Sequence, residues 1–136
     1  DVLKESDFGF VHQVLTFIRR HEESVTSVVA APYNRIILCN LDLLIQYGPK
    51  YLDNQQYQVR LNKKINEYYW FLAGSLFQIR ERDFWRYHKR GLYEIGHPFS
   101  RYKLAKTSLI RLIDSPRATL KLFGKAVKRK LLKKSI

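Results

Sequence analysis

The sequence has one cysteine, no methionine and no long hydrophobic run. Cys39 alone cannot form an internal disulfide or a Cys-based metal site, which is consistent with a reducing compartment. Apolar runs such as Tyr68 to Ala73 are far shorter than the roughly 20 residues that cross a bilayer. The start, DVLKESD, does not resemble a signal peptide. We therefore expect a soluble or peripheral protein, and, because position 1 is not Met, a piece of a longer chain.

Acidic residues are scarce in the second half of the chain. Residues 61–136 hold nineteen Lys and Arg against five Asp and Glu, a net charge of +14, whereas residues 1–60 carry −1. Such a field favours anionic partners, whether nucleic acid, phospholipid or a phosphorylated ligand. The length of 136 residues and the hydrophobic content of 46% predict one folded domain with a core.

The pattern of apolar residues predicts a mainly α fold. Residues 1–5 read as the end of a helix, and the β-branched and aromatic residues between about 8 and 20 predict a short β-strand segment. Helical spacing begins at Pro32. A bundle of about five antiparallel helices should follow, because the predicted connections are short.

Capping and terminating residues predict where these helices begin and end. The predicted helices run from Pro32 to a stop at Gly48-Pro49, from Asn54 to Gln78, from a cap at Asp83 to Gly96, from a cap at Ser100, and from Ser115-Pro116. In the last two, the apolar residues expected to face inward are Ala105, Leu109, Leu112 and Ile113, then Leu120, Phe123, Val127 and Leu131. Tyr69 and Trp70 should lie outside the stripe of the longest helix.

Functional groups cluster where the strand segment ends, in TFIRRHEESVTS, residues 16–27. Arginine presents planar donors that suit phosphate, and neutral imidazole is a common ligand for divalent transition metals. Arg19, Arg20 and His21 together suit a metal-diphosphate, although a solvated strand end with local ion pairs would need the same residues. His88 and His97 have no partner at metal-ligand spacing, and His12 is a lone histidine between strand-like residues, so all three are interpreted as structural.

The stretch DFGFVHQVLTFIRRHEESVTS, residues 7–27, resembles the segment that closes the catalytic domain of glycosyltransferase family 2 enzymes. The stretches NRIILCNLDLLIQYGPKYL and LNKKINEYYWFLAGSLF are similar to the helical tail of one bacterial branch of that family. The resemblance implies that residues 1–30 are the edge of a truncated GT-A α/β domain. Residues 31–136 would then form a helical C-terminal module.

The resemblance also implies roles for residues of the cluster. His21 matches the family histidine that approaches the metal or the donor diphosphate, Arg19 and Arg20 match the basic pair before it, and Ser24 and Thr26 match hydroxyls on a loop over the donor. The family's metal-binding acidic motif and catalytic base lie upstream of this segment. The divalent metal, Mn or Mg, would therefore belong to the parent enzyme and would not bind tightly to this chain, which should be inactive alone.

The last predicted helix is basic and amphipathic. Its cations are Lys121, Lys125, Lys128, Arg129, Lys130, Lys133 and Lys134, and no acid follows Asp114. Such a helix is typical of attachment to anionic membranes, although a solvated tail packed on the bundle is equally compatible.

Two functions follow from these patterns. The chain is either the C-terminal part of a glycosyltransferase or a non-enzymatic basic helical module that binds nucleic acid or anionic membrane. The glycosyltransferase would move a sugar from a nucleotide-sugar donor to a saccharide or lipid-linked acceptor. In that case we expect a cytoplasmic enzyme, peripheral on the inner face of the cell membrane.

Overall fold

A computed structural model of the chain describes residues 33–134, with side chains described for residues 33–132. All regular structure in this part of the chain is helical, which confirms the mainly α prediction there. The helices are α1 (Arg35–Tyr51), α2 (Asn54–Phe77), α3 (Arg82–Glu94), α4 (Arg101–Asp114) and α5 (Pro116–Lys134). The predicted strand segment between residues 8 and 20 lies outside the described residues.

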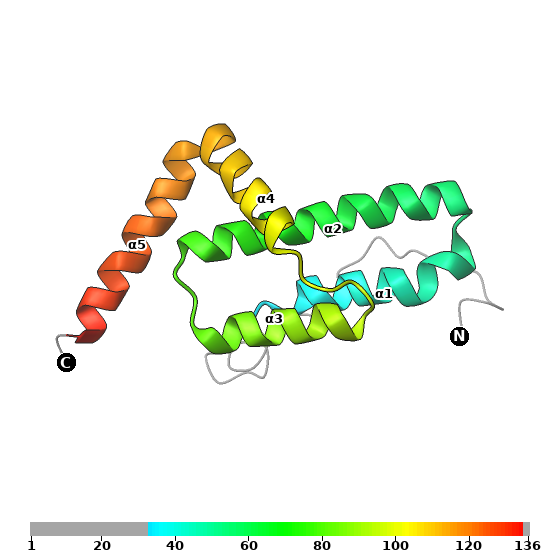
Figure 1. The fold of residues 1–136 in the computed structure, drawn as a ribbon, viewed down its shortest axis with the longest axis horizontal. Coiled ribbons are helices and arrows are strands. Elements are labelled where there is room, and N and C mark those ends of the chain that lie inside the picture. The colour runs from blue at the N-terminus through cyan, green and yellow to red at the C-terminus, as the bar shows by residue number, and fades with distance from the viewer. Residues whose placement is uncertain (1–32, 135–136) are drawn as a thin grey trace, which may run out of the picture.

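The long helix α2 organises the fold. It contacts α1, α4 and α5, and α1 in turn contacts α3. Figure 1 shows α1 and α3 on one side of α2, while α4 crosses α2 and forms a V with α5. The described helices therefore make a core between α1, α2 and α3, with α4 and α5 added to α2 as an arm.

The sequence explains why α2 begins and runs as it does. The Asp53 carboxylate accepts a hydrogen bond of 2.8 Å from the Gln56 backbone N–H, which satisfies one of the free donors of the first turn. The predicted start at Asn54 is confirmed. Along the helix, Leu61, Tyr68 and Leu72 are buried. They meet apolar side chains of α1 and α3 in the core, whose buried members are Leu38, Leu41, Leu61, Tyr68, Leu72, Phe84 and Leu92.

The prediction that Gly48-Pro49 ends the first helix is wrong, because α1 continues to Tyr51. Proline lacks a backbone N–H, so within a helix it removes one hydrogen bond and crowds the carbonyl four residues earlier. Pro49 lies in the last turn of α1, where the Ile45 carbonyl is the group that loses its hydrogen bond within the helix. The Leu52 N–H then closes the end of α1 on the Gly48 carbonyl at 2.9 Å.

The predicted cap of α3 is also wrong. Glu81 occupies the N-cap position, and Asp83 lies in the first turn, where a negative charge is favoured by the helix dipole. The predicted end at Gly96 agrees with the structure, since this glycine adopts a φ of 77° just beyond α3. Ser100 caps α4 as predicted, with its hydroxyl accepting a 3.1 Å hydrogen bond from the Lys103 N–H.

Tyr69 was expected outside the apolar stripe of α2, yet it is 4% exposed. Two sides of α2 are covered at this level: the core covers one, and the chain entering α4 covers the other. The Tyr69 hydroxyl accepts a 2.7 Å hydrogen bond from the Ser100 N–H. Trp70, the other residue expected outside, is 36% exposed.

The apolar residues expected to face inward from α4 and α5 largely face outward instead. Ala105, Leu109, Leu112, Ile113, Leu120, Phe123 and Leu131 are exposed, and Val127 is partly buried. The buried residues of these helices are small: Ser108, Thr119 and Ala126. Small residues let the helix backbones approach α2 closely, and no described element covers the opposite sides. The prediction that these apolar residues share one side of each helix was therefore correct, but the prediction that this side faces inward was wrong.

We expect Gly91→Ala to destabilise the fold, because a Cβ there would overlap the Leu38 side chain, which is buried in the core. Overpacking of this kind costs about 1–3 kcal/mol in the free energy of unfolding, measured by urea denaturation. Gly124→Ala is the matched control, since a Cβ at Gly124 meets nothing within 4 Å. This control should leave stability unchanged or raise it slightly. Equal stability of the two variants would contradict the close packing of α1 against α3.

Candidate functional site

The predicted donor-site residues Arg19, Arg20, His21, Ser24 and Thr26 lie outside the described residues. Their role in binding a metal-diphosphate therefore stays a prediction. The predicted basic surface falls within the described chain, with the exception of the Lys133 and Lys134 side chains.

The basic residues of α5 lie at the surface. Lys121, Lys125, Lys128, Arg129 and Lys130 are all exposed. Residues 101–134 hold twelve Lys and Arg against one acid, Asp114, so α4 and α5 together carry a net charge of +11. The basic residues predicted for the last helix are thus preceded by further cations on α4.

Arg129 differs from the other cations because it also contacts α2. Its Nη2 donates a 3.1 Å hydrogen bond to the Gln78 carbonyl at the end of α2. Burial and then the charge of Arg129 lower the pKa of the neighbouring Arg80 guanidinium. Arg129 therefore helps to hold α5 against the end of α2.

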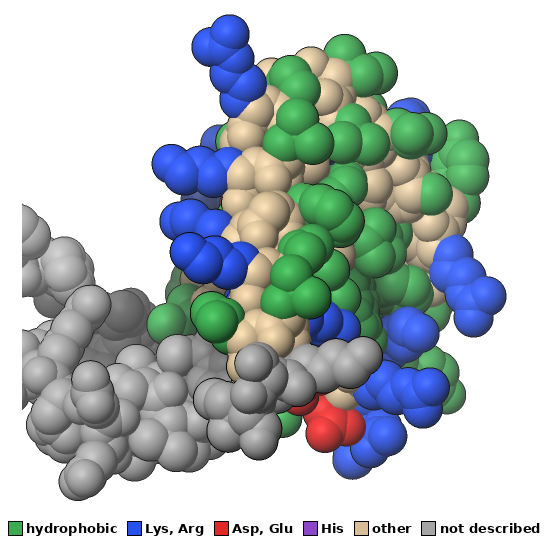
Figure 2. Space-filling model, turned by 90° about the vertical axis from the view of Figure 1, so that its left-hand side faces the viewer, with side chains coloured by type: hydrophobic (Ala, Val, Ile, Leu, Met, Phe, Trp, Pro, Cys, Tyr) green, Lys and Arg blue, Asp and Glu red, His purple; other side chains and the backbone are tan. Residues whose placement is uncertain are grey.

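Large apolar side chains are exposed beside these cations. On α5, Leu120, Phe123 and Leu131 recur at helical spacing and are 65%, 47% and 65% exposed. On α4, the exposed apolar residues are Tyr102, Ala105, Leu109, Ile110, Leu112 and Ile113. Figure 2 looks onto the α5 side of the molecule and shows hydrophobic side chains over much of this face, bordered by Lys and Arg. We call the exposed apolar and basic side chains of these two helices the α4–α5 surface.

Arg111 fixes how α4 lies on α2. Its Nη1 donates a 2.9 Å hydrogen bond to the Trp70 carbonyl, and its guanidinium carbon lies 4.9 Å from the centre of the Trp70 ring. A Cβ at Gly74 would approach this guanidinium to 3.0 Å, so the absence of a side chain at Gly74 makes room for it. Burial lowers the pKa of the Arg111 guanidinium. With Arg111 turned toward α2, the neighbours Leu109, Leu112 and Ile113 face outward.

The turn from α4 into α5 is also held by hydrogen bonds. The Thr119 hydroxyl, on the buried side of α5, lies 2.9 Å from the Ser115 carbonyl and 3.4 Å from the Arg111 carbonyl. Both acceptors belong to the end of α4 and its C-cap. These bonds connect the first turn of α5 to the end of α4.

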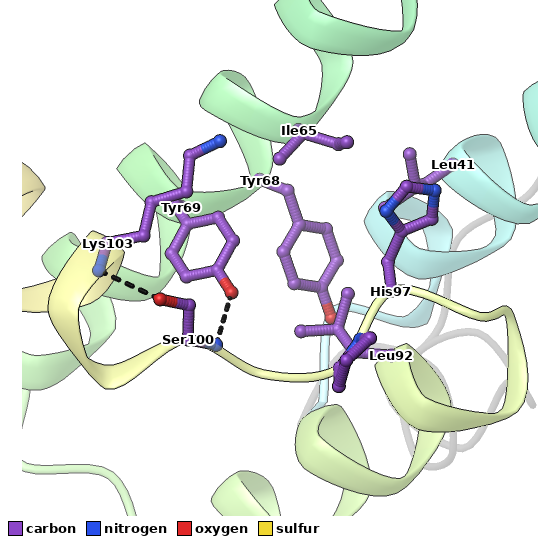
Figure 3. Close-up of a pocket in the computed structure, with 9 residues that line it drawn as sticks. Leu41, Ile65, Tyr68, Tyr69, Leu92, His97, Ser100 and Lys103 are labelled. Carbon is purple, nitrogen blue, oxygen red and sulfur yellow. Dashed lines mark hydrogen bonds between the residues drawn. The ribbon is translucent and has the colours of Figure 1, made fainter.

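A small cavity of about 180 Å³ lies between α2 and the segment that leads into α4. Two hydrogen bonds join residues of its lining: Figure 3 shows the bond from the Ser100 N–H to the Tyr69 hydroxyl and the bond from the Lys103 backbone N–H to the Ser100 hydroxyl. Sites for small organic ligands usually measure about 300–1,000 Å³. This cavity is too small to hold a sugar and is read as part of the packing.

His88 is a structural histidine, in agreement with its interpretation from the sequence. It is fully buried, and its Nε2 donates to the Tyr33 carbonyl at 2.8 Å, because a carbonyl can only accept. Its Nδ1 then accepts from the Tyr68 hydroxyl at 2.6 Å. Burial is the main cause that lowers the pKa of His88 to about 4, and burial also raises the pKa of Tyr68.

Residues 33–134 contain neither a candidate metal cluster nor a candidate membrane span. No group of three or more His, Cys, Asp or Glu in this range could hold a metal ion. None of the described helices has the length and apolarity that a membrane crossing requires. Comparisons with protein-family models, with curated proteins and with solved structures found no match.

Sequence reasoning missed the outward direction of the α4 and α5 stripes, and two signals could have indicated it. Arg111 interrupts the apolar run LIRLI, which places a cation on the side opposite to the large residues. Ser108, Thr119 and Ala126 provide small side chains where each helix approaches α2. Small residues on one side and large apolar residues on the other are typical of a helix that packs closely and leaves its apolar side free.

We expect the stability of the fold to fall as the pH decreases from about 6.5 to about 4. The lowered pKa of folded His88 means that the unfolded chain binds more protons in this interval, so protonation favours unfolding. The loss contributed by His88 should be roughly 3 kcal/mol, measured by urea denaturation across this pH range. His88→Gln should show a shallower pH dependence than the original chain. An unchanged slope in His88→Gln would contradict the buried neutral imidazole.

Proposed function

We propose that this chain is the C-terminal part of a family 2 glycosyltransferase, which transfers a sugar from a nucleotide-sugar to a saccharide or lipid-linked acceptor. The observation that carries the proposal is the segment DFGFVHQVLTFIRRHEESVTS, in which two arginines, a histidine and several hydroxyls follow a strand-like run. The helices of residues 33–134 support it indirectly, because the resembling bacterial branch also continues into a helical tail.

In this proposal the chain supplies one side of the donor site. Arg19 and Arg20 bind the donor diphosphate through planar, charge-assisted hydrogen bonds. His21 offers neutral imidazole to the divalent metal or donates to the diphosphate. Ser24 and Thr26 contribute hydroxyls beside the donor. Carboxylates of the parent enzyme would hold the metal, Mn or Mg, and the charge it would supply there is compensation for the leaving diphosphate.

The second candidate function is a non-enzymatic basic module that binds nucleic acid. The charge of +11 on residues 101–134 favours it, because Lys and Arg that neutralise phosphates give binding to nucleic acid. A salt titration of binding to duplex DNA separates the two functions. Tight binding that weakens steeply with salt supports the nucleic-acid module, and weak, featureless binding supports the glycosyltransferase.

The enzyme encoded by the complete reading frame should lose sugar transfer when His21 is replaced by alanine. Loss of a group that stabilises developing charge lowers kcat by roughly 10²–10³, so we expect a fall of at least about a hundredfold in turnover of nucleotide-sugar. The measurement is release of nucleoside diphosphate with Mn²⁺ or Mg²⁺ present. The isolated 136-residue chain should show no turnover.

His97→Ala is the matched control for this experiment. His97 lies in the helical module after α3, so its replacement should leave turnover near that of the original enzyme. Full activity of His21→Ala would contradict the donor-site role of residues 16–27. Sugar transfer by the 136-residue chain alone would show that the essential carboxylates do not lie upstream.

A further inference from the structure

We propose that the α4–α5 surface binds the headgroup region of an anionic phospholipid membrane, with the apolar side of α5 in contact with the acyl chains. The proposal rests on the described helices and does not depend on sugar transfer. It commits to a lipid surface because the exposed apolar residues and the cations occupy the same two helices.

The apolar part of the surface requires a partner that is itself apolar. Leu120, Phe123 and Leu131 form one stripe along α5, and each has about half or more of its surface exposed. Leu109 and Ile113 on α4 are 63% and 78% exposed. Contiguous apolar patches of this kind mark sites for protein or membrane contact. Duplex nucleic acid would cover the cations and leave these side chains in water.

The charge decides between a membrane and another copy of the chain. Two copies that met through this surface would bring together two segments, residues 101–134 of each chain, that both carry a net charge of +11, and like charges are costly when they are brought into contact. An anionic headgroup layer instead complements this charge. Lys121, Lys125 and Lys128 follow helical spacing in a stripe beside the apolar one. Their long side chains reach the headgroups while the apolar residues lie deeper.

The arm presents this surface in a defined orientation. Arg111 holds α4 on α2 through the Trp70 carbonyl, and Arg129 holds α5 on the Gln78 carbonyl. Thr119 joins the beginning of α5 to the end of α4. Because these contacts lie on the inner sides of the helices, docking on lipid does not require the fold to open.

The test uses the 136-residue chain and vesicles of phosphatidylcholine with or without phosphatidylglycerol, in a flotation assay. We expect binding to vesicles that contain phosphatidylglycerol and at least about tenfold weaker binding to pure phosphatidylcholine. Phe123→Asp combined with Leu131→Asp should weaken binding at least about tenfold, because charge is placed where apolar side chains enter the membrane. Lys121→Gln, Lys125→Gln and Lys128→Gln together should weaken it about a hundredfold, near fivefold for each lysine.

Matched controls change the same number of apolar or basic side chains at exposed positions outside α4 and α5. Leu43→Asp with Val59→Asp alters two apolar side chains of α1 and α2 that are 50% and 63% exposed. Arg60→Gln, Lys63→Gln and Arg82→Gln remove three exposed charges outside α4 and α5. Both control variants should bind phosphatidylglycerol vesicles within about twofold of the original chain. Circular dichroism should show that all variants remain helical.

Several outcomes would overturn the proposal. Equal losses in the charge variant and its control would show that only net charge matters. If Phe123→Asp with Leu131→Asp bound vesicles as well as the original chain, the apolar side of α5 would not contact the acyl chains. A stable dimer of the original chain that dissociates in this variant would assign the surface to a second copy. Tight duplex DNA binding that depends on the same three lysines, with no binding to vesicles, would assign it to nucleic acid.

Discussion

The hydrogen-bond chain from Tyr68 through His88 to the Tyr33 carbonyl joins three parts of the core. Tyr68 belongs to α2, His88 to α3, and Tyr33 precedes α1. Each ring nitrogen of the imidazole is used, so its burial leaves neither of them unpaired. Aromatic rings surround the histidine, with Phe84 centred 4.4 Å away and Phe71 5.6 Å away. This network sets the relative position of the three helices on which α4 and α5 are then built.

The way α4 and α5 pack depends on how little of the α2 surface the core leaves uncovered. One side of α2 is taken by the core, so α4 and α5 approach along what is left, at Ala73, Gly74 and Ser75, where α2 is buried and its side chains are small. Contacts between small residues bring backbones close but bury little apolar surface. The large apolar residues of the arm therefore stay on the outside, beside the cations. Leu104 still packs against the core from α4, so the outward side chains of α4 and α5 are the part of these helices that is free to meet a partner.

Three of the helix boundaries could be predicted because they depend on local chemistry. Asp53 and Ser100 cap α2 and α4 through their own side chains, and Gly96 closes α3 with a positive φ. Pro49 was misread because the cost of a proline depends on its place within the turn. The sequence could not show whether the apolar sides of α4 and α5 face the core or the solvent. Apolar spacing shows which residues share one side of a helix, but not what that side packs against. The donor-site residues lie in a part of the chain that the structure does not describe, so the candidate site rests there on sequence alone.

Arg111 gives α4 a property that its hydrophobic pattern would not. A guanidinium bound to the Trp70 carbonyl and stacked near the indole ring resists rotation of α4 about its own axis, because turning the leucines inward would expel the cation and break this bond. Lysine, with a single ammonium group, lacks the flat face that lies over Trp70. Arg111 thus determines how α4 is rotated about its own axis, and this rotation turns the large hydrophobic side chains outward.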